Sequence, residues 1–188
     1  MADMVAVETG KPVGHPGIHH CVHKVALDPT HPETLYMQQH EGGFRSDDGG
    51  RSWRDIGGGL PSPFGFPVAA APSNGPAGCR VWVIPENGET IGADDALRVW
   101  RTDDGGATWT PSVNGLPKGK HNVLREAMAA DALDPAGVYF GTTAGTLFAS
   151  TDGGAHWAPI AEGLRRIQSV EASVMLRRRA GPVSCRTE

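Results

Sequence analysis

The chain has 188 residues, a net charge of −4 and a mean hydropathy of −0.30, values typical of one domain or of part of a larger protein. Its 26 glycines and 15 prolines argue against long helices, and its apolar content of 39% argues against wholesale disorder. The charge offers no field to attract nucleic acid or anionic lipid, and no apolar run is long enough to cross a membrane. We therefore expect no nucleic-acid partner and no membrane.

Residues 1–18 have neither the basic start nor the apolar core of a signal peptide, and we expect them to form a flexible segment. The three cysteines, Cys21, Cys79 and Cys185, lie far apart and include no CxxC pair, so they do not predict a disulfide framework. The sequence favours reduced thiols and a cytoplasmic location.

A short motif, Ser/Thr-x-Asp-x-Gly-x-x-Trp, occurs three times in the chain. Glycine permits the positive φ of a tight turn, the Asp carboxylate accepts bonds from backbone amides, and the Trp covers the apolar layer where the next strand begins. These turn bonds explain the spacing without catalysis, so we interpret the motif residues as structural. They are Ser46, Asp48, Gly50 and Trp53; Thr102, Asp104, Gly106 and Trp109; and Ser150, Asp152, Gly154 and Trp157.

This motif resembles the BNR or Asp-box repeat of the sialidase-like β-propeller superfamily, a group of WD40/YVTN/BNR-like repeat proteins. The resemblance covers the chain from about His20 to Leu164. It implies an all-β fold, a β-propeller segment of about three four-stranded antiparallel blades, 19–61, 62–117 and 118–166, with Asp-box hairpins.

The predicted strands follow one another in four-strand groups. The first blade is expected to contain strands 21–27, 34–39, 43–46 and 52–56. The second is expected to contain strands 66–71, 80–84, 97–102 and 108–112, and the third strands 124–132, 138–141, 146–150 and 156–160. Residues 167–176 could supply a strand of a further blade, and 177–188 are expected to form a disordered tail.

Three blades do not close a ring, since propellers typically have four to eight. Three explanations stay open: the chain is part of a longer protein, copies associate to complete the ring, or the blades form an open array.

The strand order determines which loops share a face. The turns with the Asp boxes lie on one side, and the loops between the second and third strands and between blades lie on the other. The resemblance implies that ligands meet this second face. An expanded loop, 86–95, marks either a binding loop or a plain solvated excursion. The candidate binding residues are His20, His23, His40, Glu86, His121 and Arg125.

The residues His20, His23 and Glu41 offer donors for a metal. Residues three apart on a strand point to opposite faces, however, so we expect an ordinary polar rim with no metal site and no cofactor.

Catalysis by the sialidase route is not supported residue by residue. That resemblance implies an arginine cluster and a Tyr–Glu nucleophilic pair, but Tyr36 and Tyr139 occupy equivalent core positions. The remaining acid–base hypothesis pairs two of the low-priority catalytic candidates Glu41, Glu86 and Glu126 across a cleft. We therefore expect a binding or assembly module for a protein or carbohydrate, with self-association to complete the propeller. The alternative is a sialidase-like glycoside hydrolase, or a fragment of one.

Overall fold

The computed structural model describes residues 21–86 and 96–175. The expectations for residues 1–18, for His20 and for 177–188 lie outside this part, as does most of the expanded loop. The described part is all-β and holds no helix whose length and apolar character would let it span a bilayer.

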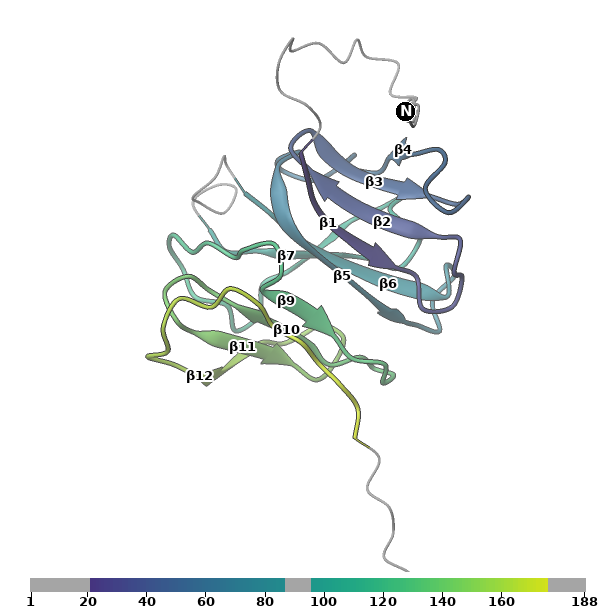
Figure 1. The fold of residues 1–188 in the computed structure, drawn as a ribbon. Helices are drawn as coiled ribbons and strands as arrows, with labels where there is room; N and C mark the ends of the chain where they lie inside the picture. The colour runs from purple at the N-terminus through teal and green to yellow at the C-terminus, as the bar shows by residue number, and fades with distance from the viewer. Residues whose placement is uncertain (1–20, 87–95, 176–188) are drawn as a thin grey trace, which may run out of the picture.

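Twelve strands form three four-stranded antiparallel sheets, which are the three predicted blades (Figure 1). The strands of the first blade are β1 (Val22–Leu27), β2 (Leu35–Gln39), β3 (Gly42–Ser46) and β4 (Arg54–Asp55). Those of the second are β5 (Gly65–Pro72), β6 (Cys79–Pro85), β7 (Val99–Thr102) and β8 (Thr110–Ser112). Those of the third are β9 (Met128–Ala130), β10 (Val138–Gly141), β11 (Leu147–Ser150) and β12 (Ala158–Ala161).

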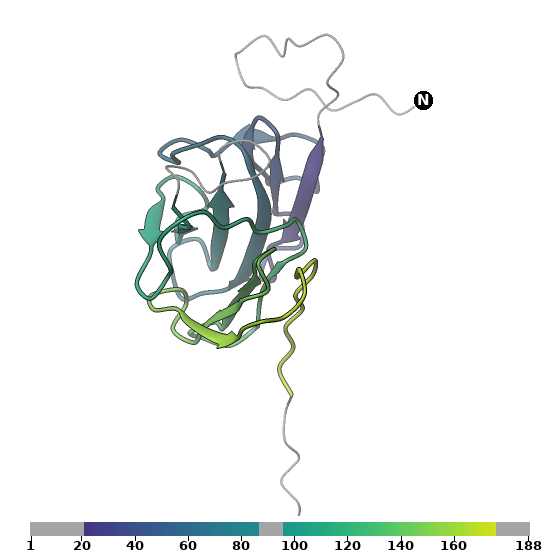
Figure 2. The same ribbon diagram turned by 90° about the vertical axis from the view of Figure 1, so that its left-hand side faces the viewer.

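The sheets stand side by side, with β5 in contact with both β1 and β9 (Figures 1 and 2). Apolar side chains fill the two spaces between them, because a blade can bury its faces only against its neighbours. Tyr36 and Val81 belong to the core between the first two blades. Trp82 and Phe140 belong to the larger core between the second and third.

The inner strand of the third blade is shorter than the sequence predicts. Ala127 donates its backbone amide to the Leu124 carbonyl at 3.0 Å, and this turn holds the chain out of the sheet until Met128. Residues 167–174 form no strand. Ser169 makes a single parallel bridge to Glu126, so this segment follows the inner edge of the third blade without pairing along it.

The three motifs form the same hydrogen-bonded turn. In the second, Asp104 accepts bonds from the Thr108 amide at 2.9 Å and from the Thr108 hydroxyl at 2.6 Å. The Thr102 hydroxyl accepts a bond from the Gly106 amide at 2.9 Å. Burial alone would raise the pKa of Asp104, but the bonds from Thr108 and Thr102 outweigh it and lower that pKa to about 2.

The motif turns also join the blades. Trp109 donates its indole N–H to the Ile56 carbonyl of the preceding blade at 2.7 Å. A Cβ on Gly106, whose φ is 91°, would lie 2.6 Å from the Ile56 side chain, so glycine serves both the turn and the close approach. Trp157 repeats this contact by donating to the Ser112 hydroxyl at 2.9 Å.

Replacing Asp104 by alanine should reduce the free energy of unfolding by about 1–2 kcal/mol, because the turn loses the acceptor of three donors. Urea denaturation at pH 7 measures this loss. The matched control is Glu162→Ala, which removes an exposed acid from the third blade. An unchanged midpoint in Asp104→Ala would contradict the structural role of the box.

Candidate functional site

The face opposite the Asp boxes, here called the loop face, carries the β2–β3 and β6–β7 loops and the connections between blades. Antiparallel pairing brings the start of each inner strand and the end of the next strand to this face, as the register of β1 with β2 shows. Of the sequence-predicted binding residues within the described part, His23, His40 and Glu86 lie at these ends.

Two histidines of the first blade meet on this face. His23 is 5% exposed, and its Nδ1 donates to the Gly65 carbonyl at the start of β5 at 2.6 Å. Its Nε2 lies 3.1 Å from Nδ1 of half-buried His40. Phe64 and Phe66 pack against the His23 ring, with centroids 5.2 Å and 4.8 Å away. His23 is therefore a buried, oriented side chain and not part of a solvated rim.

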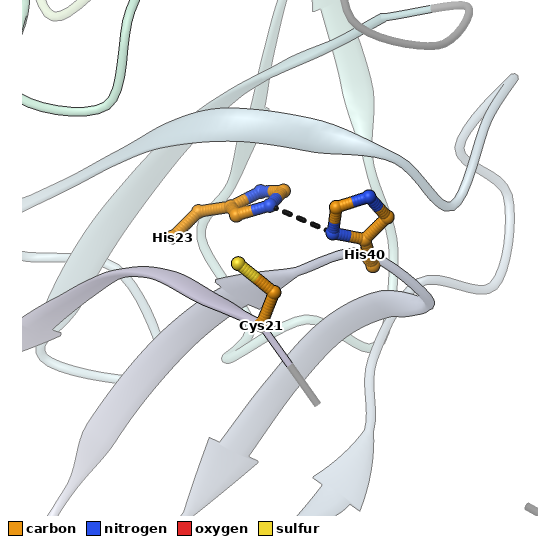
Figure 3. A group of neighbouring side chains, drawn as sticks. All are labelled: Cys21, His23 and His40. Atoms are coloured by element: carbon orange, nitrogen blue, oxygen red, sulfur yellow. Dashed lines mark hydrogen bonds between the residues drawn. The ribbon is translucent and has the colours of Figure 1, made fainter. Parts of the chain in front are cut away.

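Cys21 completes this group, at the residue before β1 (Figure 3). Its Sγ and the nearest ring nitrogens of His23 and His40 all lie within 4.8 Å of one another. The register of β1 against β2 shifts between Val22 and Lys24, and such a bulge re-aims the side chain that it contains. From its sequence position Cys21 was expected to be a reduced thiol only, because no other cysteine or histidine pattern pointed to it as a ligand.

Glu86 lies in a different environment from the exposed loop that its sequence position suggested. It follows β6 directly and is fully buried, with 0% exposure. Its Oε1 accepts the Val123 amide at 3.1 Å, and its Oε2 has no hydrogen-bond partner among the described residues. Burial raises the pKa of Glu86 to about 7, against which the Val123 bond acts in the lowering direction.

The other two carboxylate candidates do not join Glu86. Glu41 is exposed in the β2–β3 turn. Glu126 pairs instead with Lys24, whose Nζ lies 3.3 Å from the carboxylate, in a hollow bordered by the inner strands. Within the described residues, 21–86 and 96–175, no hydrogen bond or ion pair connects any two of these three glutamates.

Arg125 and His121 lie on the connection between the second and third blades. The exposed Arg125 places its guanidinium 4.7 Å from the centroid of Phe66, which ties it to the ring cluster around His23. His121 is half-buried.

A groove of about 570 Å³ opens between residues 96–98, which precede β7, the strand β8 and the connection that leaves the second blade. Val113, Leu116 and Pro117 give it apolar walls, and Arg98 and Lys118 place two cations on it. None of the described residues that line it is acidic. The apolar walls were not predicted from the sequence, which offered only the nearby basic residues.

No family model matches the sequence, and no curated protein matches it. Among solved structures, YCF48 from Cyanidioschyzon merolae is similar at a TM-score of 0.51 and 18% identity, over 78% of this chain and 39% of that chain. A structure described as YCF48 bound to D1 peptide is similar at a TM-score of 0.52 and 15% identity, over 78% of this chain and 41% of that chain. An ancestral GH74 enzyme is similar at a TM-score of 0.52 and 18% identity, over 76% of this chain and 18% of that chain.

This chain thus spans less than half the length of these proteins. At such low identity the similarity shows the fold alone. Together with the three sheets, it shows a partial β-propeller.

Proposed function

We propose that this partial propeller binds an extended segment of a protein partner on its loop face and performs no catalysis of its own. The groove beside Arg98 and Lys118 carries the proposal, because the described residues that line it are largely apolar and the charged ones among them are basic. Such a groove suits a segment that combines apolar side chains with acidic ones. The similar fold of YCF48, which has a structure with a bound peptide, supports this use of a propeller.

A carbohydrate fits the groove less well. Sugar hydroxyls are commonly held by carboxylate and amide side chains, and the lining residues in the described part of the chain supply neither an acid, an amide nor an aromatic ring.

Glycoside hydrolysis is the second candidate, and one observation favours it: buried Glu86 has the raised pKa of a general acid. The fold is also shared with a GH74 enzyme. Hydrolysis needs a second carboxylate about 5–10 Å away across a cleft, however. Of the other two candidates, Glu41 is exposed in the β2–β3 turn and Glu126 is paired with Lys24. Turnover of sialyl or aryl glycosides that disappears in Glu86→Gln would favour the hydrolase and defeat the binding-only proposal.

We also propose that two copies of the chain associate through their end blades. Ile56 and Ser112 are buried by the Asp-box turn of the next blade, whereas Ile160, at the equivalent position of the last blade, is 57% exposed. At the opposite end, Trp53 donates to Gly50 of its own turn, while Trp109 donates to a preceding blade. These two ends are complementary, because the chain already makes the same contact twice internally.

Two copies would supply six blades in place of three, within the range of closed propellers. The contact is head-to-tail, so two copies form a closed ring only if the rotation that relates them brings the free end of the second copy back to the free end of the first.

Replacing Arg98 or Lys118 by alanine should weaken peptide binding at least tenfold. The probe is a synthetic peptide selected from a displayed random library on the intact chain, and calorimetry measures its affinity. Arg51→Ala is the control, because Arg51 is an exposed cation of the first Asp-box turn, on the other face. If peptides bind all three variants as tightly as the wild type, the groove is not the peptide-binding site. Selective binding of oligosaccharides would indicate a carbohydrate ligand in place of a protein partner.

A further inference from the structure

The three donors of Cys21, His23 and His40 are those of a transition-metal site. Cysteine Sγ and imidazole nitrogens suit Zn²⁺ and other borderline first-row ions, whereas Mg²⁺ and Ca²⁺ require oxygen ligands. We propose that Cys21, His23 and His40 bind one Zn²⁺ at the loop-face end of the first blade, with the fourth position left to water or another donor.

The hydrogen bond behind His23 fixes the tautomer that a metal needs. A carbonyl oxygen can only accept, so the proton of neutral His23 resides on Nδ1, where it bonds the Gly65 carbonyl at 2.6 Å. The lone pair then lies on Nε2, which faces His40. A metal-binding histidine is commonly oriented by such a second bond from its other nitrogen.

The spacing of the donors is close to that of tetrahedral zinc. Zinc–nitrogen bonds of 2.0–2.1 Å place two ligand nitrogens about 3.3 Å apart, and His23 Nε2 lies 3.1 Å from His40 Nδ1. The sulfur should lie about 3.6 Å from each nitrogen, and no two of the three donor atoms are more than 4.8 Å apart. Cys21 is exposed before the strand begins, so its side chain can turn to close the remaining gap.

The surroundings limit the movement of the two rings. Phe64 packs edge-on against both of them, at 5.2 Å from His23 and 5.0 Å from His40. This apolar shell restrains the rings and reduces access of water, which strengthens the bonds from nitrogen to a metal. Metal binding would join the start of β1 to the turn after β2 and to the second blade through Gly65.

Cobalt binding tests the site in the full chain under reducing conditions. Co²⁺ bound by a thiolate and two imidazoles gives a sulfur-to-metal absorption band in the near ultraviolet and intense visible bands of tetrahedral cobalt. We expect one Co²⁺ per chain, its displacement by Zn²⁺, and a rise in melting temperature on adding Zn²⁺ because the metal binds the folded state.

Two variants assign the ligands. Cys21→Ser should abolish the sulfur band, and His40→Gln should weaken Co²⁺ binding at least tenfold. The control is His31→Gln, which changes an exposed histidine of the β1–β2 turn at the other end of the blade and should bind Co²⁺ like the wild type.

Two results would overturn the proposal. One is a wild-type chain without the sulfur band. The other is Co²⁺ binding that both Cys21→Ser and His40→Gln leave unchanged, which would leave the His23–His40 contact as an ordinary N–H···N hydrogen bond.

Discussion

The Glu86→Gln variant should be more stable than the wild type at pH 8 by up to about 3 kcal/mol, with little difference at pH 4.5. The pKa of Glu86 is raised from 4.5 in a solvated chain to about 7 in the folded one. Each pKa unit corresponds to about 1.4 kcal/mol. Ionising this fully buried carboxyl therefore costs the folded state about 3 kcal/mol.

The direction follows from proton binding. Between pH 4.5 and 7 Glu86 keeps a proton in the folded chain that it has released in the unfolded chain, so its contribution to the stability of the fold falls as the pH rises through this range. Glutamine keeps the shape and the acceptor for the Val123 amide but carries no charge at any pH. Urea denaturation at a series of pH values measures the difference.

Exposed Glu41 provides the control for this experiment. Glu41→Gln removes a carboxylate from the β2–β3 turn and should leave the pH dependence of wild-type stability unchanged. Equal pH profiles for wild type and Glu86→Gln would mean that the Glu86 carboxyl is solvated in the folded protein, against its complete burial.

Association between copies should be lost when aspartate replaces Ile160. This side chain is 57% exposed, yet its counterpart Ile56 is 5% exposed against Gly106 of the next blade. A charge buried in that contact without a partner carries a large desolvation cost. We expect the wild type to sediment as a dimer in the micromolar range and Ile160→Asp to sediment as a monomer.

Val113→Asp is the matched change, since Val113 is an aliphatic side chain of similar exposure, 44%, in the peptide groove. It should remain dimeric while losing peptide binding. A wild-type chain that stays monomeric at high concentration, or a dimer that survives Ile160→Asp, would exclude the proposed end-to-end contact.

The blades were predictable because each repeat contains the residues that form its own turn. The Asp-box residues are close in sequence, and bonds such as Thr108 amide to Asp104 depend on only a few residues. The strands around them were predicted within a few residues, apart from the start of β9 and the segment after residue 166, where turns and single bridges replace strand pairing.

The candidate sites were less predictable because they depend on contacts distant in sequence. Cys21 and His40 are brought together by the pairing of β1 with β2, and His23 faces them because of a bulge in that pairing. The pairing of the first hairpin, which sets Val22 opposite Gln39, was the signal that could have indicated this group. Nothing near Glu86 in the sequence indicates burial, since it is the second and third blades that enclose it.

The amino-acid sequence by itself determined the class of fold, the three repeats and their turns, because backbone conformation and short-range hydrogen bonds decide them. Only the tertiary structure decided which polar side chains are buried, paired or gathered into a group. The physical reason is that desolvation and ligand geometry are set by neighbouring blades, whose distance and register no local pattern encodes.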